Sequence, residues 1–148
     1  MELLEGLVAQ LRTITLLKDS VAGIEELEEA FNTTQAKLRT PAAFAILLEE
    51  SAGRNELMNA IEQRVTVGFA IVLAIENTLN PRGVVGGGYK SNLQTVRELV
   101  FDKIMDYQSD AKYDPAEYSR GRLVKIQDGT LWWQEEFTTA YYRRKITT

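Results

Sequence analysis

The stretch with the clearest potential for chemistry is glycine-rich and reads GVVGGGYKS over residues 83–91. It follows a long apolar run and precedes a helical pattern, which is the order of a loop that binds nucleotide phosphates. Such a loop follows G-x-x-x-x-G-K-[ST], in which the lysine reaches the phosphates and the hydroxyl reaches magnesium. Gly83 and Gly88 have the required separation, but Tyr89 intervenes before the Lys-Ser pair. The spacing therefore favours a surface connection, with a phosphate site as the alternative.

Other catalytic residue types are scarce. The chain of 148 residues has no cysteine and no histidine, so it lacks a thiol nucleophile, a thiolate metal site and the commonest general base. The carboxylate pairs Glu49-Glu50 and Glu135-Glu136 are expected to point to opposite strand faces, which prevents either pair from acting as an acid–base dyad. Four aspartates recur at a spacing of four: Asp102, Asp106, Asp110 and Asp114. We interpret them as a solvated face, and we predict no catalytic residue, no cofactor and no metal site.

The composition is that of an ordinary globular protein, with 45% hydrophobic and 26% charged residues. The formal net charge of −4 disfavours broad binding to nucleic acid, which relies on lysine and arginine. The N-terminus carries Glu2 and Glu5 where a signal peptide has positive charge, and no apolar run reaches the ~20 residues of a membrane span. We therefore expect one domain over residues 1–148 that is made in the cytosol and binds no membrane.

Three segments have helical periodicity. Residues 2–12 predict an amphipathic helix, and residues 24–31 predict a short acidic one. A third helix is predicted over residues 92–108, packed on a sheet. The segment before it, residues 77–92, is predicted to be a flexible loop, and its length favours function or mobility.

Four segments predict strands. Residues 41–50 and 63–76 alternate between faces, and the second has large side chains on one face and small ones on the other. The small face suits a close neighbour, such as another subunit. Residues 51–62 between them are polar and predict a loop or a bulged crossover. Asp128-Gly129 predicts a type I′ turn joining strands over 122–127 and 130–143.

These elements predict an α+β fold with a single four-stranded, largely antiparallel sheet and helices packed on one face. On the last strand Trp132 must face away from Trp133, so both cannot lie in one core. We predict Trp132 as a candidate interface aromatic, with burial under the domain's own helices as the alternative.

Four stretches together resemble the tail terminator proteins of long-tailed bacteriophages. They are LRTPAAFAILLEE, QRVTVGFAIVLAIEN, LQTVRELVFDKIMDY and DGTLWWQEEFTTAYY, and they fall within residues 38–142. The resemblance implies a small, non-enzymatic α+β subunit that assembles into a ring, typically a hexamer. Such a ring caps the finished tail tube, stops its polymerisation and presents a surface to the connector of the head.

The resemblance implies three partners: further copies of the chain, the tail tube protein and the head–tail connector protein. It implies assembly in the host cytoplasm and a final position at the head-proximal end of the virion tail, with DNA passing through an acidic ring. We expect the loop to contact a partner through Arg82, Tyr89 and Lys90. The alternatives are a head–tail connector or tail-completion subunit, a homo-oligomeric module without a terminating role, and a phosphate- or nucleotide-binding enzyme that uses residues 83–91.

Overall fold

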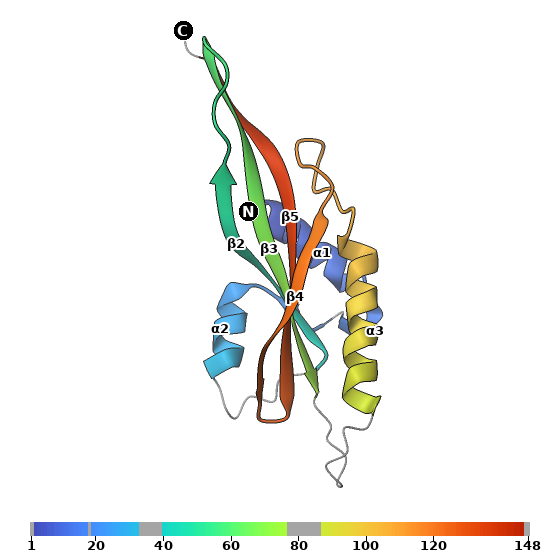
Figure 1. Cartoon of the computed structure of the whole chain (residues 1–148). Coiled ribbons are helices and arrows are strands. Elements are labelled where there is room, and N and C mark those ends of the chain that lie inside the picture. The colour runs from blue at the N-terminus through green and yellow to red at the C-terminus, as the bar shows by residue number, and fades with distance from the viewer. Residues whose placement is uncertain (1, 18, 33–39, 77–86, 147–148) are drawn as a thin grey trace.

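The computed structural model describes residues 2–17, 19–32, 40–76 and 87–146, with the backbone alone at 31–32 and 87–92. Its centre is one mixed sheet of five strands in the order β1-β2-β3-β5-β4 (Figure 1). The strands are β1 (Val21–Ala22), β2 (Ala42–Ala52), β3 (Ala60–Glu76), β4 (Glu117–Gln127) and β5 (Thr130–Ile146). The helices are α1 (Glu2–Arg12), α2 (Ile24–Asn32) and α3 (Gly87–Ile104), with a 3-10 turn η1 at Thr15–Leu17.

The α+β class is confirmed, and the predicted strand number is one too low. The additional strand, β1, pairs in parallel with β2 through Val21 and Ala22 alone. A strand of two residues is too short to produce the alternation from which strands are predicted. The remaining pairs are antiparallel, as predicted.

The central pair of strands, β3 and β5, is continuous along its whole length. Its register runs from Ala60 opposite Ile146 to Glu76 opposite Thr130 without a shift. The predicted hairpin turn is also confirmed, because Asp128 and Gly129 both have positive φ, 51° and 77°. Both strands extend several residues further than their sequence patterns indicated.

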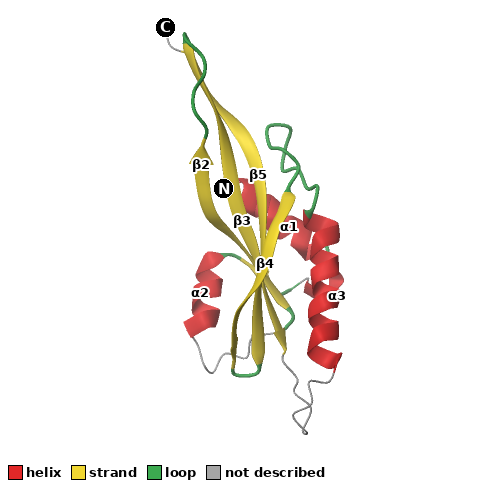
Figure 2. Ribbon diagram, in the orientation of Figure 1, coloured by secondary structure: helices red, strands yellow, loops and turns green. Residues whose placement is uncertain are grey.

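One face of the sheet is covered by α1 and α3 (Figure 2). As predicted, α3 packs on the sheet: Val96, Val100 and Ile104 are buried against the large side chains of β3. On the sheet side, the rings of Phe69 and Phe137 stack with centroids 5.5 Å apart. This cluster is the larger of the two hydrophobic cores.

The opposite face is covered by α2, so the prediction of helices on one face is wrong. Leu27 of α2 packs with Phe44 of β2 and Trp132 of β5 over the small side chains of β3. Those small side chains allow a close neighbour, as predicted, and over this half of the strand the neighbour is α2. The sequence of a short helix with a single leucine does not indicate which face of the sheet the helix will cover.

Two predicted elements differ in extent from those of the structure. The helix predicted over 92–108 begins at Gly87 and ends at Ile104, so residues 87–92 of the loop predicted over 77–92 are helical. Residues 77–86 of that loop lie outside the described residues. Asp106 follows the helix with φ 67°, the left-handed conformation that commonly ends helices. The loop predicted over 51–62 is shorter than expected, because β2 continues to Ala52 and β3 begins at Ala60, which leaves a turn over 53–59.

A buried carboxylate ties α3 to the sheet. Glu135 is fully buried (0% exposed) and accepts from Arg97 Nε on α3 at 3.0 Å and from Trp133 Nε1 at 2.7 Å. The Tyr118 hydroxyl donates to it at 3.3 Å, and burial followed by the charge of Glu135 raises the pKa of that phenol. Gly121 leaves the necessary room, since a Cβ there would collide with the Glu135 carboxylate and the Tyr118 hydroxyl.

We expect Glu135→Gln to lower the free energy of unfolding by about 1–3 kcal/mol, because it leaves the partly buried guanidinium of Arg97 without a counter-charge. Urea denaturation measures the change. Glu98→Gln is the control, since Glu98 is exposed on α3 and its change should stay within about 0.5 kcal/mol. Equal stability of the two variants would contradict the role given to Glu135.

Candidate partner-binding arm

Part of the sheet projects beyond the helices as a slender extension (Figure 1). We call it the arm and define it as residues 48–66 and 139–146, from β2, β3 and β5. Along β3 the side chains are buried from Phe69 to Ile75 but half-buried or exposed from Ala60 to Arg64. The strand pairing continues to the tip, so the arm is a regular extension of the sheet without a core of its own.

The turn at the tip, residues 53–59, is organised by the side chain of Asn55. Its Nδ2 donates to the carbonyl groups of Leu57 and Ala60 at 3.1 and 3.2 Å. Its Oδ1 accepts from the backbone N–H groups of Leu57 and Glu62 at 3.3 and 2.9 Å. One amide thus holds both ends of the turn, which fixes the chain between them.

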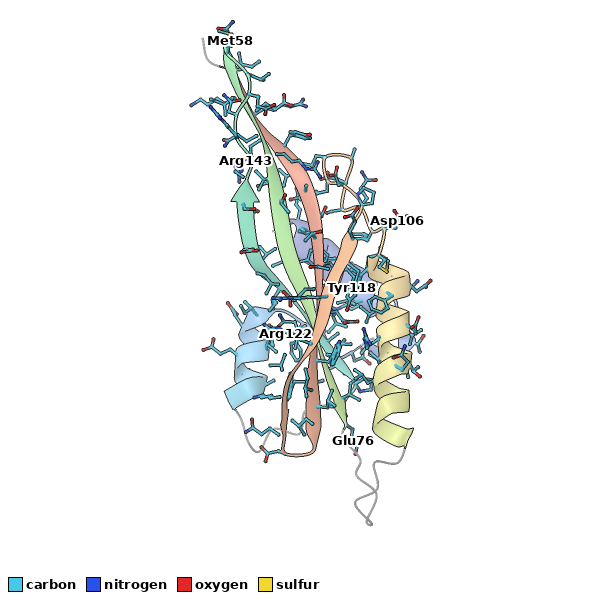
Figure 3. The ribbon with its side chains drawn as sticks, viewed as in Figure 1. Met58, Glu76, Asp106, Tyr118, Arg122 and Arg143 are labelled. Carbon is cyan, nitrogen blue, oxygen red and sulfur yellow. The ribbon has the colours of Figure 1, made fainter. Side chains whose placement is uncertain are left out.

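The arm exposes an unusual share of apolar side chains. Met58 is 97% and Ile146 81% exposed, and Figure 3 shows Met58 at the extreme end of the molecule. Six of the twelve large hydrophobic side chains exposed in the described part of the chain belong to the arm: Leu48, Leu57, Met58, Ile61, Tyr142 and Ile146. Concentrated apolar exposure marks interaction sites, and methionine adapts to irregular partner surfaces.

Charged groups surround the exposed ring of Tyr142. The guanidinium carbons of Arg64 and Arg144 lie 5.9 and 5.7 Å from its centroid. Arg64 Nη2 binds Asp114 at 2.6 Å, and this hydrogen bond raises the pKa of Arg64. Arg144 Nε binds Glu62 at 3.2 Å. Exposed pairs of this kind add little stability, so their main effect is to orient the side chains.

The same side of the arm carries a shallow depression of about 350 Å³. Its lining combines charged, aromatic and apolar groups: Arg54, Glu56, Leu57, Glu62, Arg64 and Tyr142. Arginine, tyrosine and methionine near one another are typical of protein interfaces. The arrangement is suited to binding another macromolecule.

The comparison with known families gives one result that covers nearly the whole chain. A family model described as phage tail terminator protein matches residues 4–148. The chain belongs to the phage tail terminator family. This match confirms the resemblance seen in the sequence. The members of the family are structural proteins, which locates the protein in the virion tail. No curated protein gives a significant match.

The terminator's predicted contact loop is only partly covered by the structure. Arg82 lies outside the described residues, and Tyr89 and Lys90 belong to the first turn of α3, where the backbone alone is described. Glu76, after which the loop begins, lies at the opposite end of the molecule from Met58 (Figure 3). The start of α3, which carries Tyr89 and Lys90, and the arm therefore lie toward different ends of the molecule (Figure 1). Among its described helices, none has the length and apolar character needed to cross a membrane.

The predicted interface aromatic, Trp132, lies in the core on the α2 face. It is 3% exposed, and its ring centroid is 5.9 Å from that of Phe44. Lys125 Nζ lies 5.6 Å from the same ring. Trp132 and Trp133 do face opposite ways, as predicted, because Trp133 borders the α1/α3 core. Contact of Trp132 with a partner stays a prediction.

The carboxylates considered for catalysis or cation binding have structural surroundings. Glu135 and Glu136 point to opposite faces, as predicted: Glu135 binds Arg97, whereas Glu136 binds Arg120 at 2.8 Å. Within the aspartate series, Asp102 and Asp106 are exposed, as a solvated face requires. Asp110 Oδ1 accepts from the N–H of Lys112 at 2.8 Å, and Asp114 binds Arg64.

The sequence does not predict the arm, because its central part, residues 51–62, has the composition of a loop. A weak signal was present, because Leu57 and Met58 are adjacent apolar residues in the otherwise polar stretch SAGRNELMNAIE. Another is the aromatic and basic run over residues 141–145, YYRRK, whose charges are typical of an exposed strand edge. Only the strand pairing brings the two segments together.

We expect Asn55→Ala to loosen the turn at residues 53–59 while costing only about 1 kcal/mol of unfolding free energy, because water can replace hydrogen bonds at an exposed site. Chymotrypsin should cut after Leu57 several-fold faster than in the parent protein. Glu56→Ala, in the same turn, is the matched control and should not change the rate. An unchanged rate in Asn55→Ala would show that Asn55 does not hold the turn.

Proposed function

We propose that this chain forms a ring, typically a hexamer, that caps the tail tube, stops its polymerisation and provides the surface to which the head attaches. The subunits assemble in the host cytoplasm and end at the head-proximal end of the virion tail. The observation that carries the proposal is the arm: a projection with exposed apolar side chains, in a chain that belongs to the terminator family.

The two ends of the subunit differ in a way that suits a cap. One end carries the arm with Leu57 and Met58, and the other carries the polar turn at Asp128 and Gly129. A ring that binds the tube by the arm presents a different surface to the next component. A further tube subunit would not find the surface that it recognises, and growth would stop.

We assign the arm to the tube and the opposite end to the connector. A flat tube end offers grooves between subunits into which a narrow projection can insert its apolar side chains. Tyr89 and Lys90 lie at the start of α3, toward the other end, and we assign them together with Arg82 to the contact with the connector.

We expect the purified protein to shorten tubes of the cognate tail tube protein and to place a ring at one end, as seen by negative-stain electron microscopy. Leu57→Ser with Met58→Ser should weaken binding to tube ends by about tenfold or more, because apolar anchors carry much of the energy of an interface. Met105→Ser is the matched control, since Met105 is 47% exposed but lies outside the arm.

Capped tubes with the control and long, uncapped tubes with the arm variant would support both the function and the assignment of the arm. Caps formed equally by both variants would overturn the assignment alone. Tubes that stay uncapped with the parent protein would overturn the terminating role.

The opposite end has its own test. We expect Arg82→Ala, Tyr89→Ala and Lys90→Ala together to leave tube length unchanged but to reduce the joining of tails to heads, because only the connector contact is lost. An in vitro joining assay with purified heads and tails measures the effect, with the arm variant as the reference. Normal head joining would contradict this role of the three residues.

A further inference from the structure

The sheet has a free edge on each side. Among the described residues, β1 pairs only with Ala43 and Phe44 of β2, so no strand lies beside the outer edge of β2 from Ala45 to Ala52. At the other side of the sheet, β4 pairs with β5 alone (Figure 1). A free edge presents unpaired backbone N–H and C=O groups, with which a strand of another chain can pair.

Each free edge contains a short stretch of regular strand next to a β-bulge. The register of β4 on β5 shifts before Arg120 and again after Leu123, which leaves Arg120–Leu123 regular. The register of β2 on β3 shifts before Glu49, which leaves Glu49–Ala52 regular up to the end of the strand. Bulges interrupt the row of backbone groups, so a strand that pairs with β4 is restricted to a stretch of this length, and β2 offers a matching one.

The two stretches carry opposite charge. On β4, Arg120 and Arg122 bind the single carboxylate of Glu136 at 2.8 and 3.5 Å, and their side chains stay 67% and 58% exposed. On β2, Glu49 and Glu50 are exposed, and neither forms an ion pair with a described residue. Two cations that share one carboxylate leave the edge at β4 positive, whereas the edge at β2 is negative. Unlike charges on the two edges favour a contact between copies of the chain.

The charged residues also lie on matching faces of the sheet. Arg122 is opposite Gln134 on β5, and Glu49 is opposite Gly68 on β3. Gln134 and Gly68 alternate with the residues that face α1 and α3, so they belong to the face on which α2 lies. When two copies meet edge to edge with their faces aligned, the side chains of Arg122 and Glu49 can therefore stand directly opposite each other.

The directions of the strands suit a ring. Because β3 is antiparallel to β2 and β5, and β5 is antiparallel to β4, the edge strands β2 and β4 run in opposite directions. Copies related by rotation about an axis along the strands have all their arms pointing the same way. The β4 of each copy then meets the β2 of the next copy antiparallel, which is the more stable pairing. Every arm also faces the same tube end, as the proposed function requires.

We propose that β4 of one copy pairs antiparallel with β2 of the next copy, with Arg122 opposite Glu49. This inference rests on the proposed function and deepens it by naming the contact that builds the ring. The same register brings Leu123, which is 50% exposed, beside Leu48, which is 40% exposed. Because the two surfaces differ, the contact is heterologous and can repeat until a ring closes.

The register also sets the inclination of the strands in the ring. It places Gly121 of one copy opposite Glu50 of the next. Within one copy, Gly121 is level with Glu135 on β5, whereas Glu50 is level, through β3, with Thr139, four residues further along. Neighbouring copies are thus displaced along the strand direction, so the strands tilt relative to the ring axis, as the closure of a sheet requires.

Charge and direction disfavour the two-fold alternatives. Pairing of β4 with β4 would bring Arg120 and Arg122 of both copies together, and pairing of β2 with β2 would bring together Glu49 and Glu50 of both copies. Either two-fold pairing would also point the two arms in opposite directions. Such a dimer could not present both arms to one tube end.

Cysteine cross-linking tests the register. The chain has no cysteine, so single cysteines can be introduced one at a time. Arg120 and Ser51 are opposite each other in the proposed contact, so Arg120→Cys and Ser51→Cys are made in separate proteins, mixed and treated with a short bismaleimide. The reaction is carried out both in concentrated solution and on tail tubes. The matched control is Gln127→Cys mixed with Ser51→Cys, since Gln127 is exposed on β4 but lies outside the paired stretch.

The mixture of Arg120→Cys and Ser51→Cys should give cross-linked dimers in several-fold higher yield than the control. Each of the two variants alone should give no more than the control. Efficient cross-linking of either variant with itself would overturn the heterologous contact in favour of a two-fold one. A yield equal to the control, both in solution and on tubes, would overturn the contact altogether.

An exchange of charges tests the same contact without cross-linking. Glu49→Lys in one protein and Arg122→Glu in another should each weaken self-association by about tenfold, because like charges then meet. Mixing the two proteins should restore association, since every contact in an alternating ring again joins unlike charges. Glu5→Lys is the control, because Glu5 is exposed on α1, outside both edges, and its replacement should leave association unchanged.

Self-association is measured by analytical ultracentrifugation and, on tubes, by the fraction of ends that carry a complete cap in negative-stain images. A mixture that associates no better than its components, by both measurements, would overturn the proposal. Weakening by Glu5→Lys to the same degree would show that net charge, rather than this contact, controls association.

The two proposals fail in distinguishable ways. Capped tubes without cross-links between Arg120→Cys and Ser51→Cys would leave the terminating function standing and remove this contact. Cross-linked rings that do not cap tubes would keep the contact and remove the terminating function.

Discussion

The continuous pairing of β3 with β5 is the constraint on which the rest of the structure depends. Side chains alternate between faces along both strands, so their register decides which residues meet α1 and α3 and which meet α2. It places Trp133 and Glu135 on one face and Trp132 and Glu136 on the other. A slip by one residue would exchange these sets, separating Glu135 from Arg97 and exposing the tryptophan that packs under α2.

The same pair of strands performs two tasks along its length. One half lies between two helical layers and is held by burial on both faces. The other half has no such cover and keeps its shape through strand pairing and the hydrogen bonds of Asn55. The buried half can therefore support exposed apolar residues at the tip, which would destabilise a structure that had to bury them to fold.

The charge distribution divides the polar residues into internal and external roles. Glu135 is a buried structural carboxylate, whereas Glu136 on the opposite face shares its charge between two exposed arginines of β4. The cations of β4 and the acidic α2 therefore lie on the same face of the sheet.

The sequence by itself determined the elements that carry a strong period or a specific turn. Alternation located the core of β2 and β3, the stripe of Val96, Val100 and Ile104 located α3, and Asp128-Gly129 located the hairpin, because each pattern reflects local geometry. Tertiary structure decided what local geometry does not encode. It determines which face of the sheet α2 covers, and it brings Glu135 into contact with Arg97, 38 residues away in the sequence. It also places the polar stretch around Met58 at the tip of the arm. The arm has no core to impose a hydrophobic pattern on residues 60–62, so only their pairing with β5 shows that they are strand.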